Sequence, residues 1–349
     1  MNLIDLHLWQ KAYNWLCMSR IKSGHNADIW DLRFKWPNEG NLIFLQINAG
    51  VYQLSPMRII HSRYREAVAQ WSARDALVLK WVALKIKGRL PVQAVCAHVA
   101  GQRGGRTSLA MTAQAISGGA RYVYRTDIRG YYRNINKSQL LNHLYRFIHE
   151  PALRSLLYQY VHYCVDDGGE IHLPASGISR GCALSPLIGA SILWYMDVSF
   201  SERNDIFYSR YMDDCLFLSA RRWPVRRAQK QLYEFFDSTG FECHPDKTQI
   251  GKISRGFDWL GIWFTSDGAT GIAPRATENH RLRRLRLEEQ ARRSGRSRQE
   301  TEIRVQMYVR RWNIWAESQL SAANEKNNGL NTLQASNRSR RRKWTQAKY

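Results

Sequence analysis

Two adjacent aspartates between apolar segments are the feature of this sequence that most constrains its fold. The stretch FYSRYMDDCLFLSA places Asp213 and Asp214 between runs of aromatic and aliphatic residues. This pattern is typical of two strands joined by a tight turn, with the carboxylates at the turn. Charges without partners are costly between buried strands. The sequence therefore predicts a β-hairpin whose turn carries ligands for a cation.

Another carboxylate, Asp127, lies at the end of a second predicted strand. RYVYRTDI has the β-branched and aromatic content of a strand, and SQLLNHLYRFI after it has helical spacing. Nucleotidyl transfer commonly uses two divalent metals roughly 3.5–4 Å apart, and Mg²⁺ prefers carboxylate oxygens. We therefore expect Asp127, Asp213 and Asp214 to converge on Mg²⁺, or on Mn²⁺. The other aspartate pair, Asp166–Asp167, lies in a polar VDDGG segment and is expected to be a solvated turn.

The charge balance indicates a polyanionic partner. Lys and Arg total 52 against 29 acidic residues, a formal net charge of +23, while a hydrophobic content of 44% is that of a globular protein. No apolar run approaches the roughly 20 residues that span a bilayer, and the first residues lack a signal-peptide layout. The six cysteines form no C-x-x-C pair, which argues against zinc and disulfides. We expect a cytoplasmic protein without a membrane partner.

Five motifs in a fixed order resemble those of one enzyme family. They are Y-M-D-D from Tyr211, T-D-I-R-G-Y-Y from Thr126, G-I-S-R-G-C-A-L-S-P from Gly177, H-P-D-K from His244 and F-D-W-L-G from Phe257. Together they resemble the metal-binding, nucleotide-contact, lysine and primer-grip motifs of bacterial reverse transcriptases. The similarity is to YMDD-type RNA-directed DNA polymerases of the retron, group II intron-like or phage-defence-associated groups.

The resemblance implies an α+β fold, a right-hand polymerase whose antiparallel palm sheet packs on helices. Its expected parts are an N-terminal extension (1–50), fingers (51–125), a palm (126–264) with a fingers insertion around 150–180, and a helical thumb with a basic tail (265–349). Independently, the segment from Arg275 to Tyr349 has 19 Lys/Arg against seven Asp/Glu and helical apolar spacing. Within the N-terminal part, WSARDALVLKWVALKI predicts a helix and NLIFLQI is strand-like.

The resemblance also implies roles for individual residues of the catalytic centre. Asp127 and Asp213 would bind both metals, with the carbonyl of Ile128 near the nucleotide's metal and Asp214 as a more peripheral ligand.

Two further residues of this centre are implied by the same motifs. Tyr132 would be a steric gate that excludes a ribose 2′-hydroxyl, so that the substrate is a dNTP. Lys247 would act as a general acid toward pyrophosphate. The alternative for Lys247 is a surface lysine beside Asp246.

Glycine and arginine positions are the remaining candidates for substrate contact. Gly181 would let the backbone approach template or nucleotide closely. Arg180 stands where many family members have glutamine, and its guanidinium would grip a phosphate. Arg103 and Arg106, in a glycine-rich loop, are candidates for triphosphate contact, with ordinary solvated arginines as the alternative. Trp259 would support the primer end, although packing in a hairpin explains it nearly as well.

The expected function is RNA-templated DNA synthesis with dNTPs, in which an RNA template and a DNA product occupy the protein. The expected partners are a structured non-coding RNA and a protein partner or oligomer, and the expected setting is antiphage defence. Two alternatives stay open. One is DNA synthesis by the same site without a template or from a protein primer, which Arg180 permits, and the other is a non-catalytic nucleic-acid-binding protein.

Overall fold

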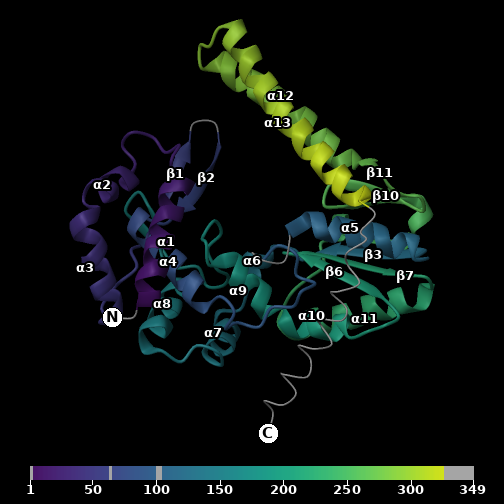
Figure 1. Cartoon of the computed structure of the whole chain (residues 1–349), viewed down its shortest axis with the longest axis horizontal. Coiled ribbons are helices and arrows are strands. Elements are labelled where there is room, and N and C mark those ends of the chain that lie inside the picture. Colours follow the sequence, from purple (N-terminus) through teal and green to yellow (C-terminus); the bar gives the residue numbers. More distant parts are fainter. Residues whose placement is uncertain (1–2, 63–64, 100–103, 326–349) are drawn as a thin grey trace. The chain divides into compact units, whose positions relative to one another are not determined.

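The computed structural model describes residues 3–62, 65–99 and 104–325, which form helices and largely antiparallel sheets, an α+β fold (Figure 1). The chain divides into two compact units. The first comprises Met1–Gln102, Tyr124–Phe217 and Arg222–Ile250, and the second comprises Arg103–Val123, Leu218–Arg221 and Gly251–Tyr349. None of the helices in the described part of the chain is long and apolar enough to cross a lipid bilayer.

The first unit begins with helices: α1 (Leu3–Ser19), α2 (Asp28–Phe34), α3 (Trp36–Asn48) and α4 (Ala73–Ile86). The predicted helix in WSARDALVLKWVALKI is confirmed as α4. It starts at a capping side chain, because the hydroxyl of Ser72 accepts a hydrogen bond from the Asp75 backbone N–H at 3.1 Å. Leu77, Trp81 and Val82 are buried on its inner face.

The strand-like prediction for NLIFLQI is wrong, because this stretch lies in helix α3. Pro37 occupies the first turn, where its fixed φ favours helix, and Ile43, Phe44 and Ile47 are buried at helical spacing. Burial of that face therefore outweighed the strand preference of the isoleucines.

A four-stranded sheet of order β2-β1-β4-β5 also belongs to the first unit. Its strands are β1 (Met57–Ser62), β2 (Arg65–Gln70), β4 (Val165–Asp167) and β5 (Glu170–His172). The polar segment around Asp166–Asp167, expected to be a solvated turn, forms a hairpin in which both aspartates belong to β4 and pair with β5. A carboxylate oxygen of Asp166 accepts the Gly169 N–H at 2.8 Å, as in an ordinary polar turn.

The sheet that positions the carboxylates has the order β6-β7-β3-β8. Its strands are β3 (Tyr122–Asp127), β6 (Phe207–Tyr211), β7 (Asp214–Ser219) and β8 (Gln249–Lys252). The strand ending at Asp127 and the hairpin carrying Asp213 and Asp214 are both confirmed. Helices α10 (Trp194–Ser201) and α11 (Arg222–Thr239) lie along this sheet (Figure 1).

An aromatic layer fixes β3, β6 and β7 against helix α10. The rings of Tyr208 and Phe217 stack with centroids 4.8 Å apart, and Phe200 of α10 contacts both of them. Tyr124 stacks on Phe217 at 5.4 Å. Such ring pairs stabilise a core beyond the area they bury.

The other helices of the first unit are short: α6 (Tyr131–Asn134), α7 (Lys137–Tyr145), α8 (Pro151–Val161), α9 (Ser185–Ile192) and the 3₁₀ turn η1 (Pro245–Lys247). The apolar pattern from Leu184 through Phe200 predicts one long helix. The backbone instead leaves the helix at Leu193, with φ −91° and ψ 8°, so that α9 and α10 are separate.

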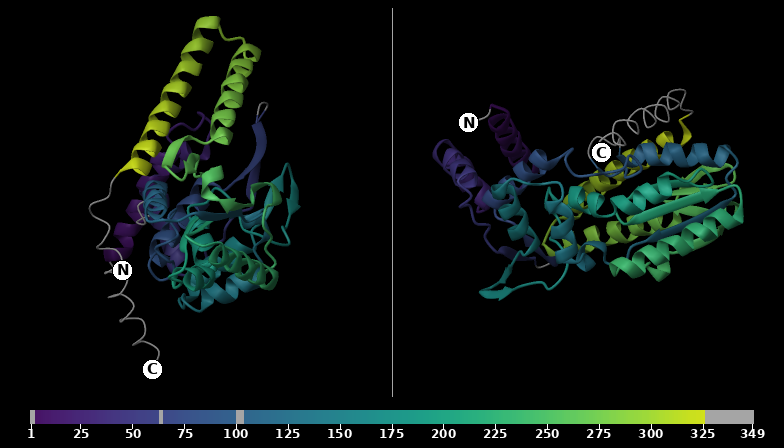
Figure 2. Two further views of the ribbon diagram at one scale, coloured as in Figure 1. Left: turned by 90° about the vertical axis from the view of Figure 1, so that its right-hand side faces the viewer. Right: turned by 90° about the horizontal axis from the view of Figure 1, so that it is seen from below.

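Within its described residues, the second unit holds a three-stranded sheet, three α-helices and a 3₁₀ turn. Its elements are α5 (Gly104–Ser117), η2 (Ile253–Arg255), β9 (Phe257–Trp259), β10 (Ile262–Thr265), β11 (Gly268–Ile272), α12 (Pro274–Arg293) and α13 (Arg298–Asn324). The predicted basic helices are confirmed as α12 and α13, which lie side by side (Figure 2). The basic stretch 326–349 lies outside the described residues.

Candidate active site

The structure brings the three predicted carboxylates together. Asp127 is the last residue of β3, Asp213 lies in the β6–β7 turn and Asp214 is the first residue of β7. Because β3 and β7 are neighbours in the sheet, the Ile128 N–H donates to the Asp213 carbonyl at 3.0 Å. One carboxylate oxygen from each aspartate lies within 4.8 Å of the others. Residues far apart in the chain therefore form one oxygen cluster.

Burial and mutual repulsion make this cluster electrostatically unfavourable without a cation. Burial raises the pKa of Asp214 to about 6, and the charges of Asp127 and Asp213 add to this rise, while Arg125, 3.7 Å away, opposes it. Burial, and then the charge of Asp127, raises the pKa of Asp213. Closely spaced carboxylates disfavour each other's charged form, and a divalent cation would reverse that effect. The oxygen donors present therefore fit Mg²⁺ or Mn²⁺.

Lys247 is part of the same cluster. Its Nζ lies 2.9 Å from Oδ2 of Asp127, and its side chain is only 26% exposed. The segment is held there because the His244 N–H donates to the Asp127 carbonyl at 2.7 Å. An unattached surface lysine beside Asp246 does not fit this contact. The ammonium instead partly neutralises the most buried of the three carboxylates.

Tyr132 lies beside the cluster with a hydroxyl that has no hydrogen-bond partner among the described residues. Its ring covers Gly189 of α9, where the methyl group of an alanine would approach the ring to 3.0 Å. Burial raises the pKa of Tyr132 to about 12, and the charge of Asp213 contributes to this rise. The tyrosine is therefore neutral, fixed by packing and within electrostatic range of the carboxylates.

The segment from Gly177 is pinned directly against Tyr132. Gly177 has φ +82°, and a Cβ there would lie 2.6 Å from the Tyr132 carbonyl oxygen, so only glycine fits. The next N–H, of Ile178, donates to that same carbonyl at 2.9 Å. Gly181 also has positive φ, +74°, with open space where a Cβ would lie. Arg180 is exposed, and its charge opposes the burial that raises the pKa of Asp213.

The two arginines predicted for triphosphate contact have different outcomes. Arg103 lies outside the described residues. Arg106 is in the first turn of α5 in the second unit, where its side chain is 53% exposed and lies 3.4 Å from a Glu325 carboxylate oxygen.

Trp259, the residue expected at the primer end, lies in the core of the second unit. It is fully buried, and its indole N–H donates to the Ser108 hydroxyl at 2.9 Å. Packing within the second unit therefore accounts for Trp259 without a ligand, and direct support of a primer end by its ring stays a prediction.

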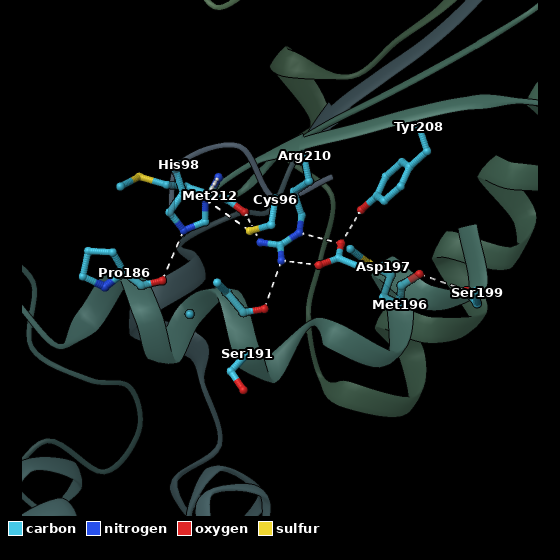
Figure 3. Close-up of polar contacts among 12 residues, drawn as sticks. Cys96, His98, Pro186, Ser191, Met196, Asp197, Ser199, Tyr208, Arg210 and Met212 are labelled. Atoms are coloured by element: carbon cyan, nitrogen blue, oxygen red, sulfur yellow. Dashed lines mark hydrogen bonds and ion pairs between the residues drawn. The ribbon is translucent and has the colours of Figure 1, made fainter. Parts of the chain in front are cut away.

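Sequence reasoning missed the buried residues that hold the carboxylate turn. Arg210 of β6 and Asp197 of α10 form a salt bridge in which both side chains have 0% exposure (Figure 3). His98 contacts the backbone of the turn itself. A signal was present, because FYSRY and WYMDVSF each contain one charge in an otherwise apolar stretch, and opposite charges of this kind are buried only as a pair.

Fold and site together define a class of enzyme. Three carboxylates from neighbouring strands of an antiparallel sheet, with a lysine and a half-buried tyrosine beside them, are the residues that a metal-dependent nucleotidyltransferase requires. Residues 63–264 match the family described as reverse transcriptase (RNA-dependent DNA polymerase). The chain belongs to this family, whose members are RNA-directed DNA polymerases.

Solved structures that match part of the chain include two of apo telomerase from Candida tropicalis. The structure truncated from its C-terminal domain is 13% identical, with a TM-score of 0.41, and the match covers 55% of this chain and 43% of that chain. The other is 11% identical, with a TM-score of 0.43, over 55% of this chain and 39% of that chain. The chain thus spans less than half of these telomerase chains. No curated protein matches it.

Proposed function

We propose that this protein catalyses RNA-directed DNA synthesis, adding dNTPs to a primer end by two-metal phosphoryl transfer. The observation that carries the proposal is the convergence of Asp127, Asp213 and Asp214, with carboxylate oxygens within 4.8 Å, in a chain of the reverse transcriptase family. These three side chains and the carbonyl of Ile128 would hold Mg²⁺ or Mn²⁺. When bound, the metals supply activation of the attacking hydroxyl and neutralisation of the leaving pyrophosphate.

The side chains around the carboxylates would orient and select the nucleotide. Tyr132 would present its ring as the steric gate against a 2′-hydroxyl. Its packing on Gly189 prevents the ring from moving toward α9. Lys247 would donate a proton to the departing pyrophosphate.

Arginines and a glycine would bind the phosphates. Arg180 is exposed, its charge acts on Asp213, and it would contact a triphosphate or template phosphate. The open space at Gly181 admits close approach of a ligand to the backbone. Arg106 and Arg103 would contact the triphosphate, which for Arg106 requires release from Glu325.

The basic helices of the second unit would track a nucleic-acid backbone. The groove between α12 and α13 is lined by more arginines than glutamates: Arg284, Arg292, Arg296, Arg298 and Arg310 against Glu288, Glu302 and Glu317. Phosphate contacts of this kind position a duplex without reading its sequence, and they weaken with salt. The excess of positive charge in the groove supports a nucleic-acid backbone as its ligand.

The finer assignment is to the bacterial phage-defence-associated or intron-like groups. The motifs from Gly177 and Tyr211 support it, and it brings an expected structured non-coding RNA, a protein partner or second copy, and a cytoplasmic location. Sequencing the nucleic acid that co-purifies with the protein tests this assignment. A single abundant non-coding RNA with complementary DNA is the expected result, and bulk cellular RNA without DNA would contradict it.

The catalytic proposal is tested by primer extension with purified protein, labelled dNTPs, Mg²⁺ and a defined RNA template annealed to a DNA primer. We expect product whose sequence complements the template. Product that ignores the template would instead establish untemplated synthesis, extension of the protein itself would establish protein priming, and no product would favour a binding protein.

A second aspartate pair provides a matched control for the metal ligands. Replacing Asp213 and Asp214 together by alanine should lower incorporation by at least ~10³-fold, because several kcal/mol of transition-state stabilisation depend on the metals. The double alanine variant of Asp166 and Asp167, at the end of β4 beside a polar turn, should keep wild-type activity. Equal activity of the two double variants would show that the carboxylate cluster is not the catalytic centre.

A further inference from the structure

The turn that carries Asp213 has a strained backbone. Met212, the first of its two residues, has φ +55°, a left-handed value that two-residue hairpins normally assign to glycine or asparagine. A side chain in this region costs on the order of 1–3 kcal/mol and persists only where the surroundings enforce it. The position and aim of Asp213 therefore depend on whatever holds Met212.

Both backbone polar groups of Met212 are held by side chains from outside the turn (Figure 3). The Met212 N–H donates to Nδ1 of His98 at 2.9 Å. The Met212 carbonyl accepts from Nη1 of Arg210 at 2.7 Å. Two independent side chains thus fix the peptide groups on either side of the strained residue.

Arg210 is itself immobilised by burial. Its Nε donates to Asp197 at 2.7 Å, a second nitrogen completes the fork on the same carboxylate, and that nitrogen also donates to the Ala190 carbonyl at 3.1 Å. The Tyr208 hydroxyl donates at 2.8 Å to Oδ1 of Asp197, the oxygen that also accepts from Nε of Arg210. Because each of these guanidinium nitrogens is hydrogen-bonded, the plane of the group is fixed in one orientation. A lysine ammonium cannot make the same set of hydrogen bonds.

His98 is immobilised from two directions. Its segment pairs with the strand that bears Arg210, because the Ala97 N–H donates to the Arg210 carbonyl at 2.9 Å. Since Nδ1 accepts the Met212 N–H, the ring proton is on Nε2, which lies 3.2 Å from the Pro186 carbonyl and donates to it. Burial lowers the pKa of His98 to about 4, which keeps this neutral form at physiological pH.

We propose that His98 and Arg210 are positioning residues of the metal site, which clamp the strained Met212 turn so that Asp213 and Asp214 present their oxygens to the cations. The proposal rests on the proposed function, since it assigns the residues that shape that same site. It predicts that loosening either contact weakens cation binding before it unfolds the protein. Supporting residues behind metal ligands typically change metal affinity by ~10- to 100-fold.

The histidine offers variants that separate its hydrogen bond with Met212 from its hydrogen bond with Pro186. A third polar contact, with the Cys96 thiol 3.4 Å from Nδ1, lies on the Met212 side of the ring. His98→Asn places an amide oxygen near the Nδ1 position and keeps the acceptor for Met212. His98→Gln reaches the Nε2 position and keeps the contact with Pro186 instead. His98→Leu removes both. For the arginine, Arg210→Lys keeps the charge opposite Asp197 but not the fork that also reaches Met212.

The experiment measures Mn²⁺ binding by electron paramagnetic resonance in the full-length protein, together with the thermal unfolding midpoint. We expect His98→Leu, His98→Gln and Arg210→Lys to bind Mn²⁺ at least ~10-fold more weakly than wild type, and His98→Asn to stay within about threefold. The affinity of the folded fraction separates positioning from simple loss of fold.

Distinct outcomes overturn the inference and the proposed function. Wild-type affinity in His98→Leu and Arg210→Lys, losses that merely follow the unfolded fraction, or binding kept by His98→Gln but not by His98→Asn would each overturn the clamp alone. If the double alanine variant of Asp213 and Asp214 bound Mn²⁺ like wild type, the metal site itself would be wrong, and the clamp with it.

Discussion

At the scale of single residues, the carboxylate site combines a buried charge with a tyrosine hydroxyl that has no hydrogen-bond partner among the described residues. Asp127 is 4% exposed, and Lys247 at 2.9 Å is its only ion-pair partner among the described residues. The Tyr132 hydroxyl makes no hydrogen bond there, which is unusual for a buried oxygen and costs free energy. The unpaired hydroxyl thus points to use of the ring or the hydroxyl by a ligand.

The ring and the hydroxyl of Tyr132 have separable consequences. Tyr132→Ala should raise the incorporation of ribonucleotides relative to deoxynucleotides by roughly 10²-fold, because the 2′-hydroxyl no longer meets an aromatic ring. Tyr132→Phe should keep the wild-type preference, since only an oxygen without a partner is lost. Competition between dNTP and rNTP in primer extension measures both. Relaxed selection in the phenylalanine variant would mean that the hydroxyl, and not the ring, excludes ribose.

At the scale of elements, the segment from Gly177 matters because it touches the chain around Tyr132. The Gly177 N–H donates to the Ile135 carbonyl at 2.8 Å, and no side chain is tolerated at its position. Two segments of the candidate site that lie far apart in the chain are thus joined backbone to backbone.

Substitution at this junction should disturb the site more than its small size suggests. Gly177→Ala would force a Cβ to within 2.6 Å of the Tyr132 carbonyl oxygen, so we expect it to lower thermal stability and to reduce primer extension at saturating dNTP by ~10-fold or more. Gly240→Ala, after the end of α11, is the matched control for backbone strain, because Gly240 has φ +76° and open space where a Cβ would lie. Comparable damage in both would attribute the effect to φ and not to the contact with Tyr132.

The elements also show what sequence patterns could and could not predict. The hairpin bearing Asp213 and helix α4 follow from apolar runs bounded by polar turns, and both are confirmed. The NLIFLQI stretch misled because a short apolar run suits strand or helix equally, and only tertiary burial decides.

The clamp around Met212 could not be predicted from pattern at all. Arg210 and Asp197 lie in different elements, and His98 follows an irregular segment, so their meeting depends on the three-dimensional course of the chain. The periodicity of apolar residues indicates which side chains face a core. It does not indicate which buried charged residues pair with one another.

At the scale of the whole molecule, buried histidines link stability to pH. His143 is 8% exposed and bonded to the Ser191 hydroxyl at 2.7 Å, and burial lowers its pKa to about 4 from the usual 6.5. As pH falls from 6.5 toward 4, His143 binds a proton in the unfolded chain but stays neutral in the folded protein. The free energy of unfolding therefore declines. Asp214 acts in the opposite direction, because its raised pKa lets the folded form take up a proton first.

Comparing wild type with His143→Gln cancels the contribution of Asp214. The glutamine keeps a donor near the Nε2 position but does not titrate, so its unfolding free energy should decline less on acidification. The two proteins should diverge by on the order of 2 kcal/mol between pH 6.5 and pH 4. Urea unfolding at several pH values measures this difference. Parallel curves would show that His143 is not the group that titrates on unfolding.

The pairing of Val95–Ala97 with Arg210 has a final consequence for how copies of this protein meet one another. Strand β6 is an edge strand of its sheet. The unpaired backbone groups of an edge strand can pair with a strand from a neighbouring molecule. In this protein the backbone N–H of Arg210 donates to the Val95 carbonyl, and the Arg210 carbonyl accepts from the Ala97 N–H. Both backbone groups of Arg210 on this edge are therefore already hydrogen-bonded. Concentrated protein should accordingly resist strand-to-strand aggregation at this position.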